Sequence, residues 1–317
     1  MTTRRDGDAD DLRRRGPDAW AAELIGTLLL VFFIGTIVSL HSEGALGVRD
    51  WAVIGLLHAF LLTMLVYTLG QASGAHFNPA VTVTLAALRK IGPIDAAIYI
   101  VLQLIGAVLG ALLVKLLLSD EGDAAAYGAT TISDYLDQKT LAGFLAELIG
   151  TFALMWAIMG VAVNPKGARD WAGIVIGGTL GFAVMAIGPM TGAGLNPARA
   201  FGPSLIGGGE EIGPFVVAYV LGPVVGALLA GVLYTALILA PEGRAPGRRP
   251  IDTLSGAAES RRGTDVELPA GVDAPATGGT GGVTGGGRGL TGTGTASGEP
   301  PATGTGTSGT DPGDPRP

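Results

Sequence analysis

Two asparagines open the same tripeptide far apart in the chain, as Asn78-Pro79-Ala80 and Asn196-Pro197-Ala198, and they are the first candidates for chemistry. Each tripeptide begins a short apolar stretch, 78–88 and 196–206. Proline at the first helical position loses no needed N–H, so both stretches are predicted to be helices. A helix N-terminus carries partial positive charge, and asparagine adds amide N–H donors. Such a site would bind a neutral acceptor such as water and disfavour a cation.

Several ionisable side chains lie inside otherwise apolar stretches, where a charge is costly, and four of them are candidates for function. Glu23 and Glu147 occupy identical hexapeptides, Ala-Glu-Leu-Ile-Gly-Thr, and are therefore interpreted as symmetry mates. A proton relay and a structural role both fit carboxyls in such positions. Arg199 follows Asn196 by three residues without a nearby acidic partner, so a side chain that reaches the membrane surface is an alternative for it. His58 fits either a hydrogen-bonded core residue or a pore residue.

The composition argues against other function classes. The chain has 317 residues and no cysteine, which excludes disulfides, thiolate metal sites and cysteine nucleophiles. The sequence contains no nucleophile–base set and no metal-ligand cluster, so we expect neither an enzyme nor a bound metal or cofactor. A net charge of −7 gives no reason to expect a nucleic-acid partner.

The charges are distributed as in a membrane protein. Only 21 charged residues fall within residues 19–240, whereas about a quarter of a soluble domain is charged. A membrane-spanning helix needs about 20 mostly apolar residues. Six stretches qualify: 20–41, 51–70, 94–118, 141–163, 171–189 and 213–240. The stretches 78–88 and 196–206 cross only about half a bilayer at about 1.5 Å per residue, so they are predicted to be re-entrant half-helices.

Four short motifs recur in order at offsets of 118 to 124 residues, which indicates a duplicated unit. Each unit, about 20–118 and 141–240, holds three spans and one half-helix. Because three is odd, the second unit must be inverted, as in transporters built from inverted repeats. The predicted fold is an all-α membrane protein with six transmembrane helices and two re-entrant half-helices whose Asn-Pro-Ala starts meet near the midplane.

Lysine and arginine in the short loops set the orientation. They cluster before the first span, after the second span and its half-helix, between spans four and five, and after span six. This pattern predicts that both termini are cytoplasmic. Residues 1–18 are interpreted as a cytoplasmic arm and 19–240 as the channel domain. Residues 241–317, rich in glycine, threonine, serine and proline, are interpreted as a disordered cytoplasmic tail.

Glycine-rich, extended segments precede both half-helices. Non-helical backbone within a membrane is tolerated where it lines a water-filled cavity, because water can satisfy the free carbonyls. The carbonyls predicted to line a pore belong to Gly74, Ala75, His76, Gly192, Ala193 and Gly194. The duplication thus predicts a narrow polar pathway that disfavours cations. His76 is also a candidate for pH gating, with a packed loop residue as the alternative.

Two motifs, Ser73-Gly74-Ala75-His76-Phe77-Asn78-Pro79-Ala80-Val81-Thr82 and Gly192-Ala193-Gly194-Leu195-Asn196-Pro197-Ala198-Arg199, resemble those of the aquaporin (major intrinsic protein) family. The resemblance covers roughly residues 20–240. It implies a homotetramer in the cell membrane with one pore per subunit. It also implies that Glu23 and Glu147 brace the two loops, and that Arg199 supplies a fixed positive charge at the external constriction.

Counting from the two asparagines places the family's other constriction positions. The resemblance implies a selectivity filter of His58, Val184, Ala193 and Arg199. This set is similar to the plant tonoplast type, which has histidine on the second span and small or aliphatic residues elsewhere. Valine and alanine leave room, so we expect a pore wider than the narrowest water channels.

The predicted function is a passive channel for water and small neutral solutes, such as ammonia, hydrogen peroxide and urea, that excludes protons and ions. Ala200 and Ser204 lack the residues usual in glycerol facilitators, which favours the water-channel branch. A glycerol-type facilitator, a coupled secondary transporter and a junction-forming scaffold are the alternatives.

Overall fold

The computed structural model describes residues 15–41 and 46–240. Within them, six helical segments are long and apolar enough to cross a membrane: Pro17–Leu40, Arg49–Ser73, Pro93–Leu117, Thr140–Val163, Arg169–Thr191 and Ile212–Leu239. The all-helical fold expected from the sequence is confirmed, and these described residues contain no strand. The predicted arm and tail fall largely on residues 1–14 and 241–317, which lie outside the described residues.

The first repeat contains α2 (Pro17–Leu40), α3 (Val48–Ser73), the half-helix α4 (Pro79–Ala87) and α5 (Pro93–Leu117). Proline at the first helical position begins α2, α4 and α5, where the N–H it lacks is not needed. α3 begins three residues before the predicted span, where the Asp50 side chain accepts a hydrogen bond from the N–H of Gly47 at 2.7 Å.

The second repeat contains α7 (Thr140–Ile158), α8 (Ala172–Thr191), the half-helix α9 (Pro197–Gly207) and a last long helix. π-helical turns extend α7 through η3 (Met159–Val163). The last helix runs through α10 (Ile212–Phe215), η5 (Val216–Leu221), α11 (Gly222–Tyr234) and η6 (Thr235–Leu239). Between the repeats, the structure adds a short helix, α6 (Ser119–Ala124), and two 3₁₀ turns, η1 (Ala126–Gly128) and η2 (Asp134–Leu136), none of which the sequence predicted.

The two repeats pack in matching ways. α5 lies along α2 and α11 lies along α7, while α3 of one repeat lies along α8 of the other. A Cβ atom on Gly106 would lie 2.5 Å from the carbonyl oxygen of Leu24, and one on Gly226 would collide with the carbonyl of Leu148. Leu24 and Leu148 occupy the same position in the repeated hexapeptide. Glycine therefore lets the backbones approach closely at equivalent places in both halves.

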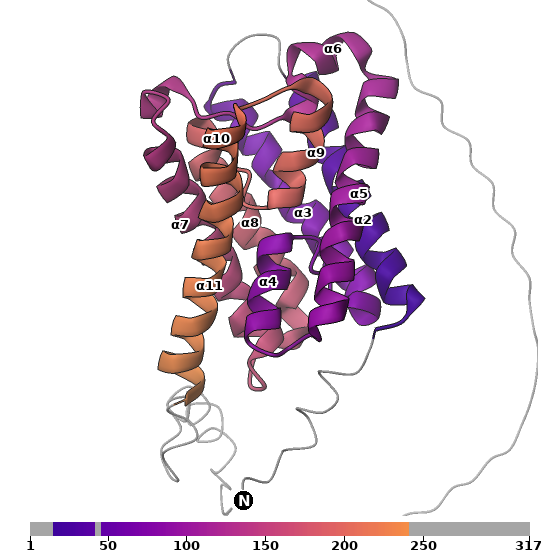
Figure 1. Ribbon diagram of the computed structural model, residues 1–317, viewed down its shortest axis with the longest axis vertical. Helices are drawn as coiled ribbons and strands as arrows, with labels where there is room; N and C mark the ends of the chain where they lie inside the picture. The colour runs from indigo at the N-terminus through magenta and orange to yellow at the C-terminus, as the bar shows by residue number, and fades with distance from the viewer. Residues whose placement is uncertain (1–14, 42–45, 241–317) are drawn as a thin grey trace, which may run out of the picture. The chain divides into compact units, whose positions relative to one another are not determined.

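The half-helices lie among the long helices. Figure 1 shows α9 in the upper half of the bundle and α4 in the lower half, with α3 and α8 behind them. Residues of α4 and α9 contact one another. Each half-helix starts at its proline, one residue after the predicted start, because the asparagine is the N-cap residue. The long helices thus hold the two asparagines near each other.

Candidate functional site

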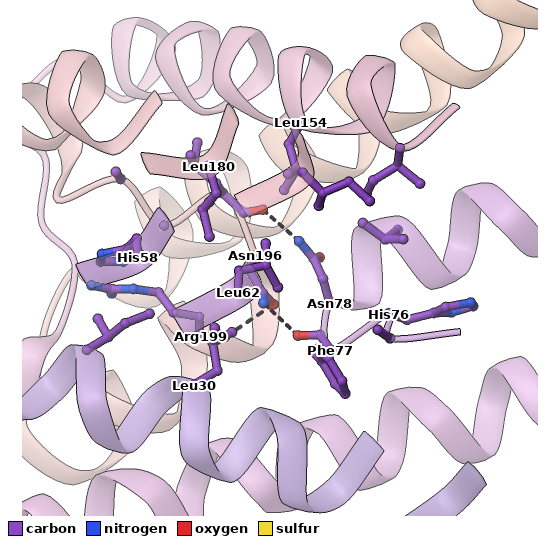
Figure 2. Close-up of a pocket in the computed structure, with 18 residues that line it drawn as sticks. Leu30, His58, Leu62, His76, Phe77, Asn78, Leu154, Leu180, Asn196 and Arg199 are labelled. Carbon is purple, nitrogen blue, oxygen red and sulfur yellow. Dashed lines mark hydrogen bonds between the residues drawn. The ribbon is translucent and has the colours of Figure 1, made fainter. Parts of the chain in front are cut away.

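Asn78 and Asn196 cap the two half-helices and tie them together. The Asn78 carboxamide oxygen accepts from the N–H of Ala80 at 2.9 Å, and that of Asn196 accepts from the N–H of Ala198 at 3.0 Å. The Asn78 Nδ2 group donates to the carbonyl of Leu195 at 2.9 Å. Reciprocally, Asn196 Nδ2 donates to the carbonyl of Phe77 at 2.7 Å (Figure 2).

These bonds refine the expectation that both amides serve a pore. An asparagine amide carries two N–H donors. One donor of each is used between the repeats, which leaves one on each amide for a solute. Both asparagines line a cavity. The remaining residues of the tripeptides are buried and do not line it: Pro79, Ala80, Pro197 and Ala198.

The segments before the half-helices have the same unusual backbone in both halves. Ala75 and Phe77 have φ values of 53° and 46°, and Ala193 and Leu195 have φ values of 48°. Residues with side chains rarely adopt such left-handed conformations, at a cost of about 1–3 kcal/mol each. The strain falls at equivalent positions, 118 residues apart, so the surrounding structure must hold both loops in this shape.

Glu23 and Glu147 hold these loops from behind. Glu23 accepts hydrogen bonds from the backbone N–H groups of His76 and Phe77 at 2.9 and 2.7 Å. Glu147 accepts from those of Gly194 and Leu195 at 2.8 and 2.5 Å. Both carboxyl groups are completely buried and neither residue lines the cavity. These contacts are those of a structural brace.

Each brace also accepts one side-chain donor, and the two donors differ. The Gln103 amide on α5 donates to Glu23 at 2.8 Å, whereas the Thr191 hydroxyl donates to Glu147 at 2.6 Å. Gln103 Nε2 donates as well to Thr82 Oγ1 at 3.0 Å. Neither Gln103 nor Thr82 was among the site residues predicted from the sequence. The only available signal was a polar glutamine within an apolar span.

A narrow cavity connects these groups. The space open to the centres of water molecules is about 30 Å³, and a single water needs about 10–15 Å³ by this measure. The cavity therefore has room for about two or three water molecules. Figure 2 shows His58 and Arg199 at one end, His76 at the other, and the two asparagines between them.

Much of the cavity wall is apolar. Its wall contains leucine, isoleucine and valine side chains: Leu30, Ile34, Leu62, Val81, Leu154, Ile158, Ile176 and Leu180. Leu30 and Leu154 each follow their brace glutamate by seven residues. These two leucines could therefore have been predicted as a pair from the repeat, because a residue seven positions further along a helix lies two turns on and near the same face.

The pair at one end is fixed by backbone carbonyls. Arg199 is 4% exposed, and its Nη1 donates to the carbonyl of Gly128 at 2.9 Å. His58 is 2% exposed, and its Nδ1 lies 2.7 Å from the carbonyl of Ile54. Gly128 belongs to η1 between the repeats, and no sequence signal linked it to Arg199. A φ of 84° and a close approach to Gly35 suit glycine at this turn.

The other predicted filter residues are placed differently from each other. Ala193 lines the cavity, as His58 and Arg199 do. Val184 is fully buried on α8 and does not line it. Val184 lies one helical turn beyond Leu180, which does line the cavity, so the two residues share a helix face.

The predicted carbonyl residues also divide into two groups. Ala75, His76, Ala193 and Gly194 line the cavity. Gly74 and Gly192 instead end α3 and α8, with φ values of 90° and 73°, and do not line it. Their N–H groups bond back to the carbonyls of Gly70 and Gly188. They end the long helices, and the pore segment begins one residue later.

His76 lies in a bonded cluster at the far end of the cavity. Its Nδ1 is 3.1 Å from Thr82 Oγ1, and its ring meets Tyr99 edge to face with 5.2 Å between centroids. The Thr82 hydroxyl donates to the carbonyl of Asn78 at 3.1 Å, so its oxygen accepts from Gln103 and His76. His76 is thereby held against the first half-helix.

The charges around the cavity are positive. The N-termini of α4 and α9 and the Arg199 guanidinium face it, while no acidic side chain lines it. Within the described ranges 15–41 and 46–240, no group of three or more histidine or acidic side chains could hold a metal ion. This arrangement can offer hydrogen bonds to neutral solutes and opposes cations.

These features define a membrane channel built on an inverted repeat, and comparisons with known proteins agree. The profile described as Major intrinsic protein matches residues 16–234. A probable aquaporin, AqpM, of Archaeoglobus fulgidus is 40% identical over 240 residues, which cover 69% of this chain and 96% of that protein. The glycerol uptake facilitator protein-like 6 of Lactiplantibacillus plantarum is 37% identical over 211 residues, 67% of this chain and 94% of that one.

A solved aquaglyceroporin from Plasmodium falciparum has the same fold, with a TM-score of 0.61 and 24% identity over 71% of this chain and 97% of its own. The chain belongs to the major intrinsic protein family, whose members are passive membrane channels and not enzymes. The likeness of its constriction to plant tonoplast-type members stays a prediction.

Proposed function

We propose that this protein conducts water, and with it ammonia, hydrogen peroxide and urea, passively across the cell membrane while excluding protons and ions. The observation that carries the proposal is the reciprocal asparagine pair at the centre of a narrow cavity. A water molecule there accepts from the remaining N–H of Asn78 and of Asn196. It is then poorly placed to pass a proton along the file, as in other aquaporin-type pores.

In this proposal, His58, Val184, Ala193 and Arg199 form the selectivity filter. Arg199 contributes a fixed charge and donors, and His58 contributes a second polar group at the same end of the cavity. Val184 and Ala193 are small enough to leave space for solutes somewhat larger than water. The pore carbonyls are those of Ala75, His76, Ala193 and Gly194.

The positions of the two buried glutamates favour a passive channel over a coupled transporter. A coupled transporter needs titratable or ion-ligating groups along its pathway. Glu23 and Glu147 lie behind the loops and accept three hydrogen bonds each. Flux should accordingly be linear in solute concentration and independent of ion gradients.

The assembly and location follow the same proposal. We take the protein to be a homotetramer in the cell membrane with one pore per subunit, and both termini to be cytoplasmic. The loop bias of lysine and arginine supports this orientation. Residues 1–18 and 241–317 would then lie in the cytoplasm.

Glycerol conduction is a second candidate, favoured by the apolar wall of the cavity. Leucine and isoleucine side chains that line the same cavity as His58 and Arg199 suit a solute that carries both carbon and hydroxyl groups. The similarity to a glycerol uptake facilitator-like protein supports the same candidate.

Stopped-flow light scattering of proteoliposomes under water, urea and glycerol gradients tests both candidates. We expect rapid water and urea movement and slower glycerol movement. Replacing Val184 by histidine should narrow the filter and reduce urea flux more than water flux. An equal loss of both would contradict this filter, and glycerol flux equal to that of urea would favour the facilitator.

A further inference from the structure

The orientation of the His58 ring has a chemical consequence for the solute. Its Nδ1 lies 2.7 Å from the carbonyl of Ile54, and a carbonyl can only accept. Nδ1 must therefore carry a hydrogen. Arg199 already places a positive charge near the ring, so the neutral ring, with the hydrogen on Nδ1, is the form that fits this position.

The other ring nitrogen is then a fixed hydrogen-bond acceptor. His58 Nε2 is buried and has no hydrogen-bond partner among the described residues. The residue lines the cavity beside Arg199, whose Nε likewise has no partner there. One end of the cavity therefore presents an unpaired side-chain acceptor next to an unpaired donor.

The other polar side chains of the cavity do not supply an equivalent acceptor at this end. The carboxamide oxygens of Asn78 and Asn196 already accept from half-helix N–H groups. Their free groups are N–H donors. A solute that passes without a hydrogen to donate leaves His58 Nε2 unsatisfied in a buried place, which is costly.

We infer that this filter selects small neutral solutes that both donate and accept hydrogen bonds, and rejects acceptor-only solutes of the same size. The inference rests on the proposed channel function and narrows its substrate class. Water, ammonia, hydrogen peroxide and urea all carry donors. Dimethyl sulfoxide has as many heavy atoms as urea but no hydrogen-bond donor. Its two methyl groups make it bulkier, so a variant that lacks the acceptor must separate the donor requirement from size.

The test measures urea and dimethyl sulfoxide influx into proteoliposomes, each corrected with protein-free liposomes, together with water flux. We expect protein-dependent urea flux at least about tenfold above that of dimethyl sulfoxide. In the His58→Phe variant, which keeps a ring but lacks the acceptor, this ratio should fall toward one. Leu116→Phe adds a ring on the exposed side of α5, at a residue that does not line the cavity, and it should retain the preference for urea.

Nitrogen NMR of ¹⁵N-histidine protein provides a readout independent of transport. The chain has three histidines, so the His58 signals are those lost in His58→Phe. We expect a protonated Nδ1 and an unprotonated Nε2. The opposite tautomer, or comparable urea and dimethyl sulfoxide fluxes, would overturn the inference. Normal water flux without urea flux would overturn it too and leave the water channel standing, whereas absent water flux would refute the channel itself.

Discussion

The two halves of the bundle, 17–117 and 140–239, share a backbone design but differ in the side chains placed on it. Each half has an asparagine-capped half-helix, a strained loop and a buried glutamate that accepts two loop N–H groups. Even the tyrosines match, since Tyr99 and Tyr219 donate to the carbonyls of Ser73 and Thr191.

The differences lie in the polar residues around the cavity. At an offset of 118 residues, Arg199 of the second half matches Val81 of the first, and His58 matches Ile176. All four line the cavity. Thr82 and His76 likewise match Ala200 and Gly194. The symmetric backbone therefore builds the pathway, whereas the asymmetric side chains give it a polar filter at one end and a histidine cluster at the other.

The largest expected effect comes from removing one of the two braces, Glu147 of the second half. Glu147→Gln replaces an acceptor oxygen by an amide that faces buried donors of Thr191, Gly194 or Leu195. We expect a loss of about 3 kcal/mol or more in unfolding free energy, because buried unsatisfied donors cost about 1–3 kcal/mol each. Thermal unfolding in detergent and the yield of monodisperse protein measure this loss.

Glu211→Gln is the matched control, because Glu211 is exposed. Its unfolding temperature should stay close to that of the unmodified protein. A stable Glu147→Gln variant with intact water flux would show that the brace is dispensable.

A smaller loss should follow from alanine at the equivalent helix contacts. Gly106→Ala and Gly226→Ala push a Cβ atom into the carbonyls of Leu24 and Leu148. We expect about 1–3 kcal/mol of destabilisation from each. Gly178→Ala, where a Cβ atom meets nothing within 4 Å, should be neutral or stabilising by up to about 1 kcal/mol. Thermal unfolding in detergent measures both losses. Clearly different losses for Gly106→Ala and Gly226→Ala would show that the two helix contacts are not equivalent.

Arg199→Val gives the second half the residue that the first half has at the equivalent position, Val81. Removing the fixed charge should raise proton or cation leak roughly tenfold, equivalent to about 1.4 kcal/mol of barrier, while water flux persists. A pH-sensitive dye inside proteoliposomes reports the leak. An unchanged leak would mean that the half-helices and the two asparagines, and not Arg199, provide the barrier to protons and cations.

Thr82→Ala makes the first half resemble the second, which has Ala200, and should have the smallest effect. The variant loses the hydroxyl that accepts from Gln103 and His76. We expect a cost of about 1–2 kcal/mol and water permeability within about twofold of the unmodified protein. A larger loss of water flux would show that the cluster around His76 takes part directly in water conduction.

Much of this architecture could be predicted because it is periodic or duplicated. The length of the apolar stretches predicted the spans to within a few residues, and the short apolar stretches that start at Asn-Pro-Ala predicted the half-helices to within one residue. The reciprocal bonds of Asn78 and Asn196 could not be predicted, because they join residues 117 and 119 positions apart without a local signature. The Arg199–Gly128 contact likewise depends on how a loop between the repeats folds.

The most direct test of the central claim is water permeability of proteoliposomes measured together with internal pH. The account predicts osmotic shrinkage much faster than in protein-free liposomes, linear in the osmotic gradient, with no protein-dependent proton flux under an imposed pH gradient. Shrinkage no faster than in protein-free liposomes, or a clear proton flux through the unmodified protein, would contradict it.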